Sequence, residues 1–312
     1  MGALLSLRDS LSRFYGKYDT VIRLICKFLL AFLSFSAING RLPGMTWIGS
    51  PLLIVLAALI CAFLPSNSIV MVSTAMLLLH FYAISLEAAL AGGGMLIIGC
   101  LLYFSIAPSS SVPVVLTALA IGKGIPCAVP VIFGLVGGPL AAAGVIFGTF
   151  IYYLTENVRT YGGSLEASSA DAAEAMIQKM TVMMRQVMSD RRMMVMAVSL
   201  AVTLWVIWLF RRMAVKYAWM VAAVFGCLTC VLIRSGGALI FGLRLDIPGL
   251  ILELITALIV AWLAQAFLFS LDYRRTENVR FEDEDYYYYV KAVPKRKIRR
   301  VRRTRRVERR ER

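Results

Sequence analysis

Charged and metal-binding side chains are scarce in this chain of 312 residues. Asp, Glu, Lys and Arg make up 16% of it, against about a quarter of an average soluble domain, and histidine occurs once. The sequence contains no nucleophile elbow (G-x-S-x-G), no zinc-protease helix (H-E-x-x-H) and no Walker A phosphate loop. The sequence therefore predicts that the protein is not an enzyme and that it holds no cofactor.

Hydrophobic residues, by contrast, make up 60% of the chain. Between residues 21 and 271 they form runs of about 15–24 residues, and about 20 helical residues cross the hydrocarbon core of a bilayer. Inside lipid every backbone polar group needs a partner within the protein, so only helices and closed barrels can span it. Because the runs do not alternate strictly, we predict an all-α integral membrane protein.

The apolar runs predict a first membrane block at 21–155 and a second at 193–271. Between two of the spans, the segment 109–136 consists of two apolar pieces separated by glycines and prolines. Each piece is too short to cross alone, which predicts a re-entrant hairpin or a broken helix. About eight spans are expected, at 21–37, 50–64, 68–88, 91–107, 138–155, 193–210, 217–235 and 248–271.

The distribution of positive charge predicts the orientation. Residues 291–312 contain 13 Lys and Arg and two Glu, so this stretch alone carries +11 of the formal +15. By the positive-inside rule both the amphipathic N-terminus, 1–20, and the tail, 272–312, are expected in the cytoplasm. An even number of spans then places the polar connection 156–192 outside.

Within the polar connection, a methionine-rich amphipathic helix is expected. Ile177, Met180, Met184 and Val187 recur at helical spacing, and we expect them to pack against the same chain. The pentapeptide TENVR occurs at 155–159 and again at 276–280. An internal duplication would place both copies in the cytoplasm, but no wider similarity accompanies them, so coincidence is preferred.

Ionisable side chains in membrane segments are the candidates for a functional site, because burying them in lipid is costly. They are His80 and Glu87 in the third span, Lys123 in the broken segment, and Glu253 in the last span. His80 and Glu87, seven residues apart, are expected on one helix face. We hypothesise a polar site in which Lys123 faces Glu87 or Glu253; alternatively, the carboxylates reach water and Lys123 snorkels or closes a turn.

The six cysteines lie in or beside apolar segments, and we interpret them as small buried hydrophobic residues. Cys227 and Cys230 form a C-x-x-C pattern inside a predicted span. A structural zinc site needs four ligands, and the sequence shows no further ones nearby. The sequence therefore predicts no metal site.

The cytoplasmic tail joins four acidic residues to four tyrosines and then to a basic block. Tyrosine and valine favour extended structure, so 281–293 could add as a strand to the sheet of a cytoplasmic protein partner. Phosphorylation of the tyrosines and a solvated tail are the alternatives. The residues expected to bind the partner are Tyr286, Tyr287, Tyr288, Tyr289 and Val290.

The basic block is expected to contact anionic membrane lipid, because clustered Lys and Arg beside a membrane gain about 1 kcal/mol per residue near the surface. An acidic protein is the second choice of partner. Nucleic acid is not favoured, because no recognition fold or stacking platform accompanies the block. The expected lipid contacts are Arg299, Arg300, Arg302, Arg303, Arg305 and Arg306.

Three segments resemble a group of polytopic membrane proteins of Gram-positive anaerobic bacteria, some of which carry the label permease. They are FEDEDYYYYVKAVPK (281–295), FRRMAVKYAW (210–219) and IPCAVPVIFGLVGGP (125–139). The resemblance covers most of the chain and implies a bacterial plasma-membrane location. It brings no catalytic residue and no substrate.

Two classes of function follow from the sequence. The first is a scaffold or assembly component of a membrane complex, which recruits a partner through the tail. The second is a transporter or channel subunit with a polar site around 109–136. The first is narrowly preferred, and the sequence leaves a homo-oligomer open.

Overall fold

The computed structural model describes residues 2–42, 49–108, 111–161, 172–213, 217–268, 277–282 and 287–292. The chain divides into two units, residues 19–264 and residues 1–18 together with 265–312. Within the described ranges the elements are α1 (Gly2–Arg41), α2 (Pro51–Phe63), α3 (Asn67–Ile84), α4 (Leu86–Ile106), α5 (Ser111–Gly122), α6 (Ala128–Val136), α7 (Ala141–Tyr161), α8 (Ala172–Met188), α9 (Arg191–Phe210), α10 (Ala218–Phe241), α11 (Ile247–Leu268), β1 (Glu277–Glu282) and β2 (Tyr287–Ala292).

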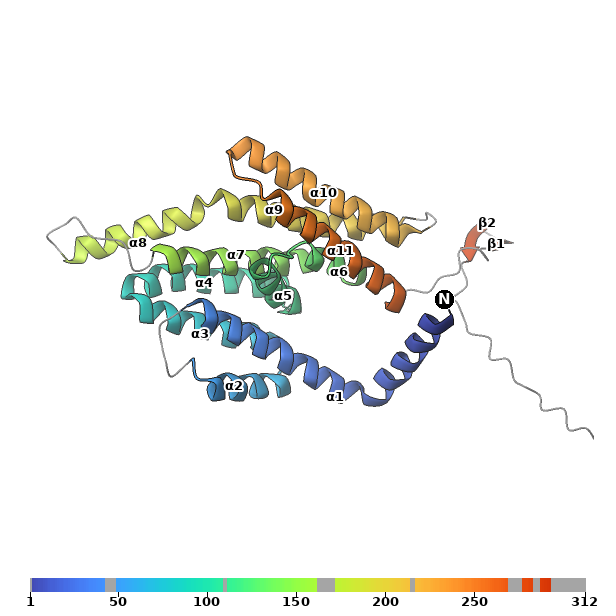
Figure 1. Cartoon of the computed structure of the whole chain (residues 1–312), viewed down its shortest axis with the longest axis horizontal. Helices are drawn as coiled ribbons and strands as arrows, with labels where there is room; N and C mark the ends of the chain where they lie inside the picture. The colour runs from blue at the N-terminus through green and yellow to red at the C-terminus, as the bar shows by residue number, and fades with distance from the viewer. Residues whose placement is uncertain are drawn as a thin grey trace, which may run out of the picture. The chain divides into compact units, whose positions relative to one another are not determined.

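The helical architecture is that of a multi-pass membrane protein (Figure 1). Among the described residues, six stretches are long and apolar enough to cross a bilayer: Phe14–Arg41, Asn67–Ile84, Leu86–Ile106, Met176–Phe210, Ala218–Phe241 and Ile247–Phe267. Large apolar side chains also stay exposed on the helices, Leu239 by 81% and Leu52 by 73%. Lipid, rather than water, is the solvent that such surfaces fit.

Two expected spans, α2 and α7, are not among the six. α2 has 13 residues and therefore a length of about 20 Å, which is short of a ~30 Å hydrocarbon core. α7 is long enough, but its last turns are polar and include Glu156, Asn157 and Arg159. Among the described residues, six of the eight expected spans are therefore long and apolar enough to cross a bilayer.

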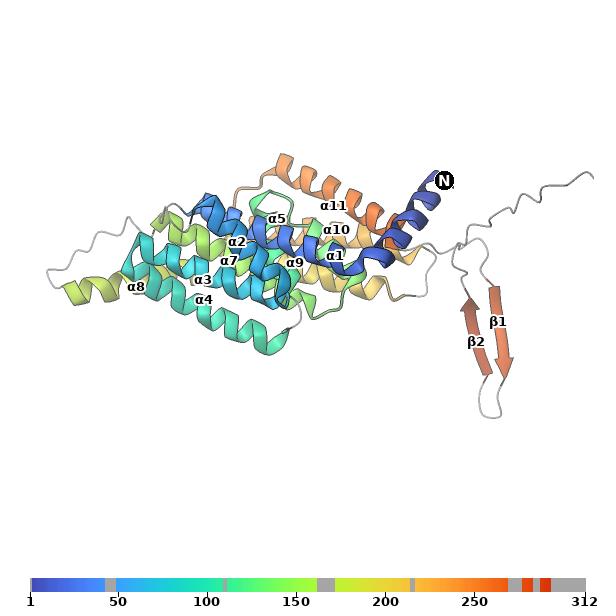
Figure 2. The same cartoon turned by 90° about the horizontal axis from the view of Figure 1, so that it is seen from below.

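The helix α7 lies at the centre of the larger unit. It contacts α4, α5, α6, α8 and α9, and both views show it between these neighbours (Figures 1 and 2). Small residues allow the close contacts. A side chain at Gly148 would strike the carbonyl oxygen of Val114 on α5, and one at Gly134 on α6 would strike Ile207 on α9. Because α7 has neighbours on all sides, its buried residues are distributed around the whole helix.

The broken segment predicted at 109–136 is confirmed as two short helices, α5 and α6. α5 ends because Gly124 adopts a left-handed conformation, with φ of +73°. The amide of Ile125 donates to the carbonyl of Ala120 at 2.9 Å, and the amide of Gly124 donates to that of Ile121 at 3.1 Å. These two bonds form a Schellman motif, which satisfies the last carbonyls of a helix. The chain then turns and begins α6 after Pro126.

The chain also breaks between α3 and α4, inside the predicted span 68–88. Ser85 has an extended backbone, and its hydroxyl accepts a hydrogen bond from the amide of Ala88 at 3.0 Å. A serine N-cap of this kind starts a new helix. The prediction that His80 and Glu87 share one helix face is therefore wrong, because His80 lies in α3 and Glu87 in the first turn of α4.

The predicted amphipathic helix of the polar connection is α8, and it packs against α4 and α7 of the same chain, as expected. The expected face is only partly right. Val187 and Met180 pack in the core together with Met183, whereas Ile177 is 65% exposed and Met184 is 44% exposed. The polar connection is also shorter than expected at its start, because α7 continues through the first TENVR to Tyr161.

In the smaller unit, β1 and β2 form an antiparallel hairpin in which Glu277 is opposite Ala292 and Glu282 is opposite Tyr287 (Figure 2). The extended structure expected for the tyrosine run is present in β2, but its partner strand comes from the same chain. Residues 277–280 of the second TENVR lie in β1, whereas the first TENVR is helical. Because the two copies of TENVR have different secondary structures, they support our preference for coincidence over an internal duplication. Tyr286 and the predicted lipid-contacting arginines lie outside the described residues.

The predicted boundary between the amphipathic N-terminus and the first span, at residues 20 and 21, falls within α1. Tyr18 departs from helical geometry there, with φ of −120° and ψ of 27°, and marks a kink. The apolar part of α1 that could cross the membrane includes this kink and ends at Arg41.

Candidate functional site

A buried ion pair joins α10 and α11 at the break between α5 and α6. The guanidinium of Arg234 donates a hydrogen bond to Oε2 of Glu253. The Glu253 side chain is only 4% exposed and that of Arg234 is 23% exposed. A carboxylate so deeply buried needs a counter-charge and hydrogen bonds, because burying an unpaired charge is costly.

The second oxygen of Glu253 binds the start of α6. The backbone N–H of Cys127, the residue that caps α6, donates to Oε1 of Glu253 at 2.9 Å. The first N–H groups of a helix have no partner inside the helix, and this end carries a partial positive charge. Glu253 therefore satisfies one of these donors and supplies the negative charge that the helix end favours. Both the break and the ion pair are parts of one site.

Three buried thiols complete this site. Cys127 lies at the start of α6, and Cys227 and Cys230 lie one helical turn apart on α10. The thiol of Cys127 interacts with both of the others. The sulfurs of Cys127 and Cys230 and a carboxylate oxygen of Glu253 all lie within 4.8 Å of one another. Thiol and carboxylate donors from three helices thus converge on one point.

A polar pocket of about 520 Å³ lies between the end of α7, the α8–α9 turn and the end of α10. Asp190, in the wall of the pocket, caps α9 through Oδ1. Its other carboxylate oxygen, Oδ2, accepts a hydrogen bond from the side-chain amide of Asn157 at 3.1 Å. Tyr153 in the wall of the pocket lies within electrostatic range of Arg234. The volume lies within the roughly 300–1,000 Å³ of small-ligand pockets.

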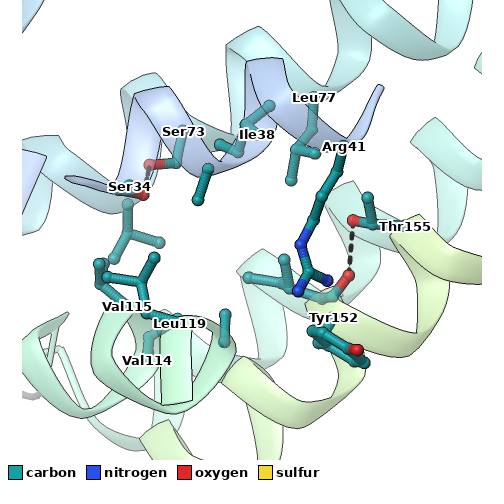
Figure 3. Close-up of a pocket in the computed structure, with 14 residues that line it drawn as sticks. Ser34, Ile38, Arg41, Ser73, Leu77, Val114, Val115, Leu119, Tyr152 and Thr155 are labelled. Atoms are coloured by element: carbon teal, nitrogen blue, oxygen red, sulfur yellow. Dashed lines mark hydrogen bonds between the residues drawn. The ribbon is translucent and has the colours of Figure 1, made fainter. Parts of the chain in front are cut away.

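A second cavity lies between α1, α3, α5 and α7, and it is mainly apolar (Figure 3). Arg41 extends from α1 toward α7, with its guanidinium 4.4 Å from the centre of the Tyr152 ring. The hydroxyls of Ser34 and Ser73 bond to each other at 3.0 Å. About 60 Å³ is available in it, which is enough for a few waters but not for a solute. The polar pocket is therefore the better candidate for a binding site.

The pairing hypothesised for Lys123 is wrong, because the two carboxylates have other partners. Glu253 pairs with Arg234, and Glu87 lies 3.8 Å from the ammonium of Lys179 on α8. Lys123 itself is exposed at the break. His80 is fully buried, and neither ring nitrogen has a hydrogen-bond partner among the described residues. Of the four predicted residues, only Glu253 belongs to the site around the break.

Sequence reasoning missed Arg234, Cys127 and the C-x-x-C pair as parts of this site. Arg234 could have been predicted from the sequence, because it is an arginine inside the predicted span 217–235 and Glu253 lies in the next span. The thiols gave a weaker signal, because Cys127 lies about a hundred residues from Cys227 and only the fold brings them together.

The fold and the site define a multi-pass helical membrane protein with a buried charged site at a helix break. No protein-family model, curated protein or solved structure matches this chain.

Proposed function

We propose that the protein is a transporter or channel subunit that passes a small polar or charged solute through the site at the break between α5 and α6. The single observation that carries this proposal is the Glu253 carboxylate, which is buried between Arg234 and the N–H of Cys127. Ionisable groups inside membrane-spanning segments often mark solute pathways in membrane proteins. Interrupted helices also supply solute sites in membrane proteins, because their ends expose backbone donors and acceptors.

The polar pocket supports the proposal because one of its lining residues lies near the ion pair. Tyr153 lines the pocket and lies close enough to Arg234 for an electrostatic interaction. A solute could therefore pass from the pocket toward the ion pair.

The proposed topology has eight spans with both termini in the cytoplasm of a plasma-membrane protein. The six apolar stretches together with α2 and α7 make eight, and α5 and α6 form a hairpin that enters and leaves on one side. The basic tail supports the orientation through the positive-inside rule. In this arrangement the polar pocket opens outside and the tail lies in the cytoplasm.

Reactivity of the native thiols tests the pathway. A membrane-impermeant cationic methanethiosulfonate is added to sealed vesicles that contain the reduced, metal-free protein, and peptides are read by mass spectrometry. Cys127, Cys227 and Cys230 should be labelled, because opening of a pathway exposes them to water. Cys61 is buried in α2, away from the pocket, and is the internal control. Labelling of the three no faster than Cys61, from either side, would refute the pathway.

A second function, scaffolding through the tail, is favoured by the β1–β2 hairpin. A two-stranded hairpin is at best marginally stable in water, and each strand has an outer edge free of sheet partners in the described chain. A partner sheet could therefore extend it. Purification of the full-length protein from native membranes is compared with versions that end at Arg275 or at Pro294. Loss of a stoichiometric partner only in the shorter version supports the hairpin; equal recovery from all three argues against it.

A further inference from the structure

Three thiols and a carboxylate gather at the start of α6, and the donor atoms of Cys127, Cys230 and Glu253 lie within 4.8 Å of one another. Cys127, Cys227, Cys230 and Glu253 come from α6, α10 and α11, so no local sequence requirement brings them together. The other cysteines of the chain, Cys26, Cys61 and Cys100, lie elsewhere in the fold. Only at this point of the described structure do cysteine and carboxylate donors converge in a group of three or more.

The geometry points to a thiophilic divalent metal ion, of the zinc class, as the solute of this site. Zinc takes four ligands in tetrahedral geometry and prefers thiolate, imidazole and carboxylate donors. Two thiolates bound at ~2.3 Å to a tetrahedral ion lie about 3.8 Å apart. Three of the four donor atoms, those of Cys127, Cys230 and Glu253, already lie within 4.8 Å of one another, so side-chain shifts of about 1 Å would bring them to bonding distance. The thiol of Cys227 interacts with that of Cys127 and would supply the fourth ligand. This inference rests on the proposed function, since it names the solute of the same site.

The C-x-x-C spacing explains why α10 can supply two ligands. Residues three apart on a helix lie on the same face, so Cys227 and Cys230 both face α6. Cys127 faces them from the start of α6, and Glu253 supplies an oxygen from α11. Softer thiolate donors in the majority favour zinc-like ions over magnesium and calcium, which take oxygen ligands.

Charge and protons balance for this binding step. Three neutral thiols and the Glu253 carboxylate take up one divalent ion and release three protons, so that the four ligands and the ion carry a net charge of −2. The guanidinium of Arg234 offsets one of these charges. It keeps its bond to the carboxylate oxygen that does not bind the ion, and acts as an outer-shell partner that orients the ligand.

Cobalt(II) titration of the reduced full-length protein in detergent tests the inference. Expected are one ion per chain, thiolate-to-cobalt charge-transfer absorption and the visible bands of tetrahedral cobalt, which zinc abolishes and excess magnesium does not. Cys127→Ser and Cys230→Ser should each weaken binding by more than the 10–100-fold typical of outer-shell changes. The matched control Cys26→Ser, at an exposed cysteine, should bind normally. Absence of the thiolate bands, or their persistence in the Cys127→Ser/Cys230→Ser double variant, would overturn the inference.

X-ray absorption at the zinc edge of the wild-type protein gives a measurement that depends on no variant. Three sulfurs at about 2.3 Å and one oxygen at about 2.0 Å support the site, and a shell of oxygen and nitrogen alone contradicts it. Failure of metal binding would leave the thiol-labelling result, and hence the pathway, intact. Metal binding without labelling would instead leave a static metal site and refute transport.

Discussion

Removing the arginine of the buried ion pair should destabilise the protein strongly. Arg234→Met leaves the carboxylate of Glu253 buried with the N–H of Cys127 as its remaining partner in the site. Breaking a buried pair from one side costs about 3–5 kcal/mol, because an uncompensated charge stays inside. We expect a loss of this size in the free energy of unfolding.

Removing the carboxylate should cost less than removing the arginine. The Arg234 side chain is 23% exposed against 4% for Glu253, so solvent reaches the guanidinium more easily than the carboxylate. Glu253→Gln also keeps an oxygen that can accept from the N–H of Cys127. The expected loss is about 1–3 kcal/mol, the range for a buried group that loses one partner. The double variant should be nearly as stable as Glu253→Gln alone, because it buries no unpaired charge.

Unfolding in mixed detergent micelles, titrated with a denaturing detergent, measures these free energies. The matched control is Arg159→Met, which breaks an ion pair with Glu156 whose two side chains are 49% and 38% exposed. Exposed pairs contribute about 0–1 kcal/mol, so this variant should unfold almost like the wild type. A stability of Arg234→Met equal to that of Arg159→Met, or a larger loss for Glu253→Gln than for Arg234→Met, would refute the reasoning.

Three further changes test helix packing and capping elsewhere in the larger unit. Gly148→Leu should lower the free energy of unfolding by about 1–3 kcal/mol or more, because the new side chain strikes a backbone carbonyl of α5. The control is Gly94→Ala, where no atom lies within 4 Å of the added methyl group. Detergent unfolding measures both. Ser85→Ala should cost about 1 kcal/mol by removing the N-cap of α4, measured in the same way. Lys179→Glu should loosen α8 from α4 through repulsion of Glu87, seen as faster proteolysis after residue 161; an unchanged cleavage rate would contradict this.

Much of the helical layout could be predicted because it depends on local chemistry. The broken segment follows from Gly124, which permits the left-handed turn at the end of α5, and from the proline that opens α6. The positions of the long apolar helices follow from hydropathy alone. The α3–α4 corner was missed, although Ser85 is a good helix cap, because the apolar run continues through it without interruption.

The charge partners could not be predicted, because pairing depends on which helices become neighbours. Glu253 has Lys123 and Arg234 as cationic candidates on separate segments, and hydropathy does not rank them. In the structure Glu253 pairs with Arg234 because α10 faces α11 at these residues, whereas Lys123 is exposed at the break. The same limit applies to the thiols, whose convergence requires the contact between α6 and α10.

The two roles of Glu253 connect the break to the proposed solute. The carboxylate accepts from both Arg234 and the backbone N–H of Cys127, so its charge is balanced and both of its oxygens are hydrogen-bonded. In the proposed metal complex Oε1 would also donate a lone pair to the ion, and this loss of electron density would make it a weaker acceptor for the N–H of Cys127. Binding therefore weakens the bond between α11 and the tip of the hairpin, and release restores it. Under the proposed function, occupancy of the site would therefore be coupled to the contact between α11 and α6, because the same carboxylate oxygen takes part in both.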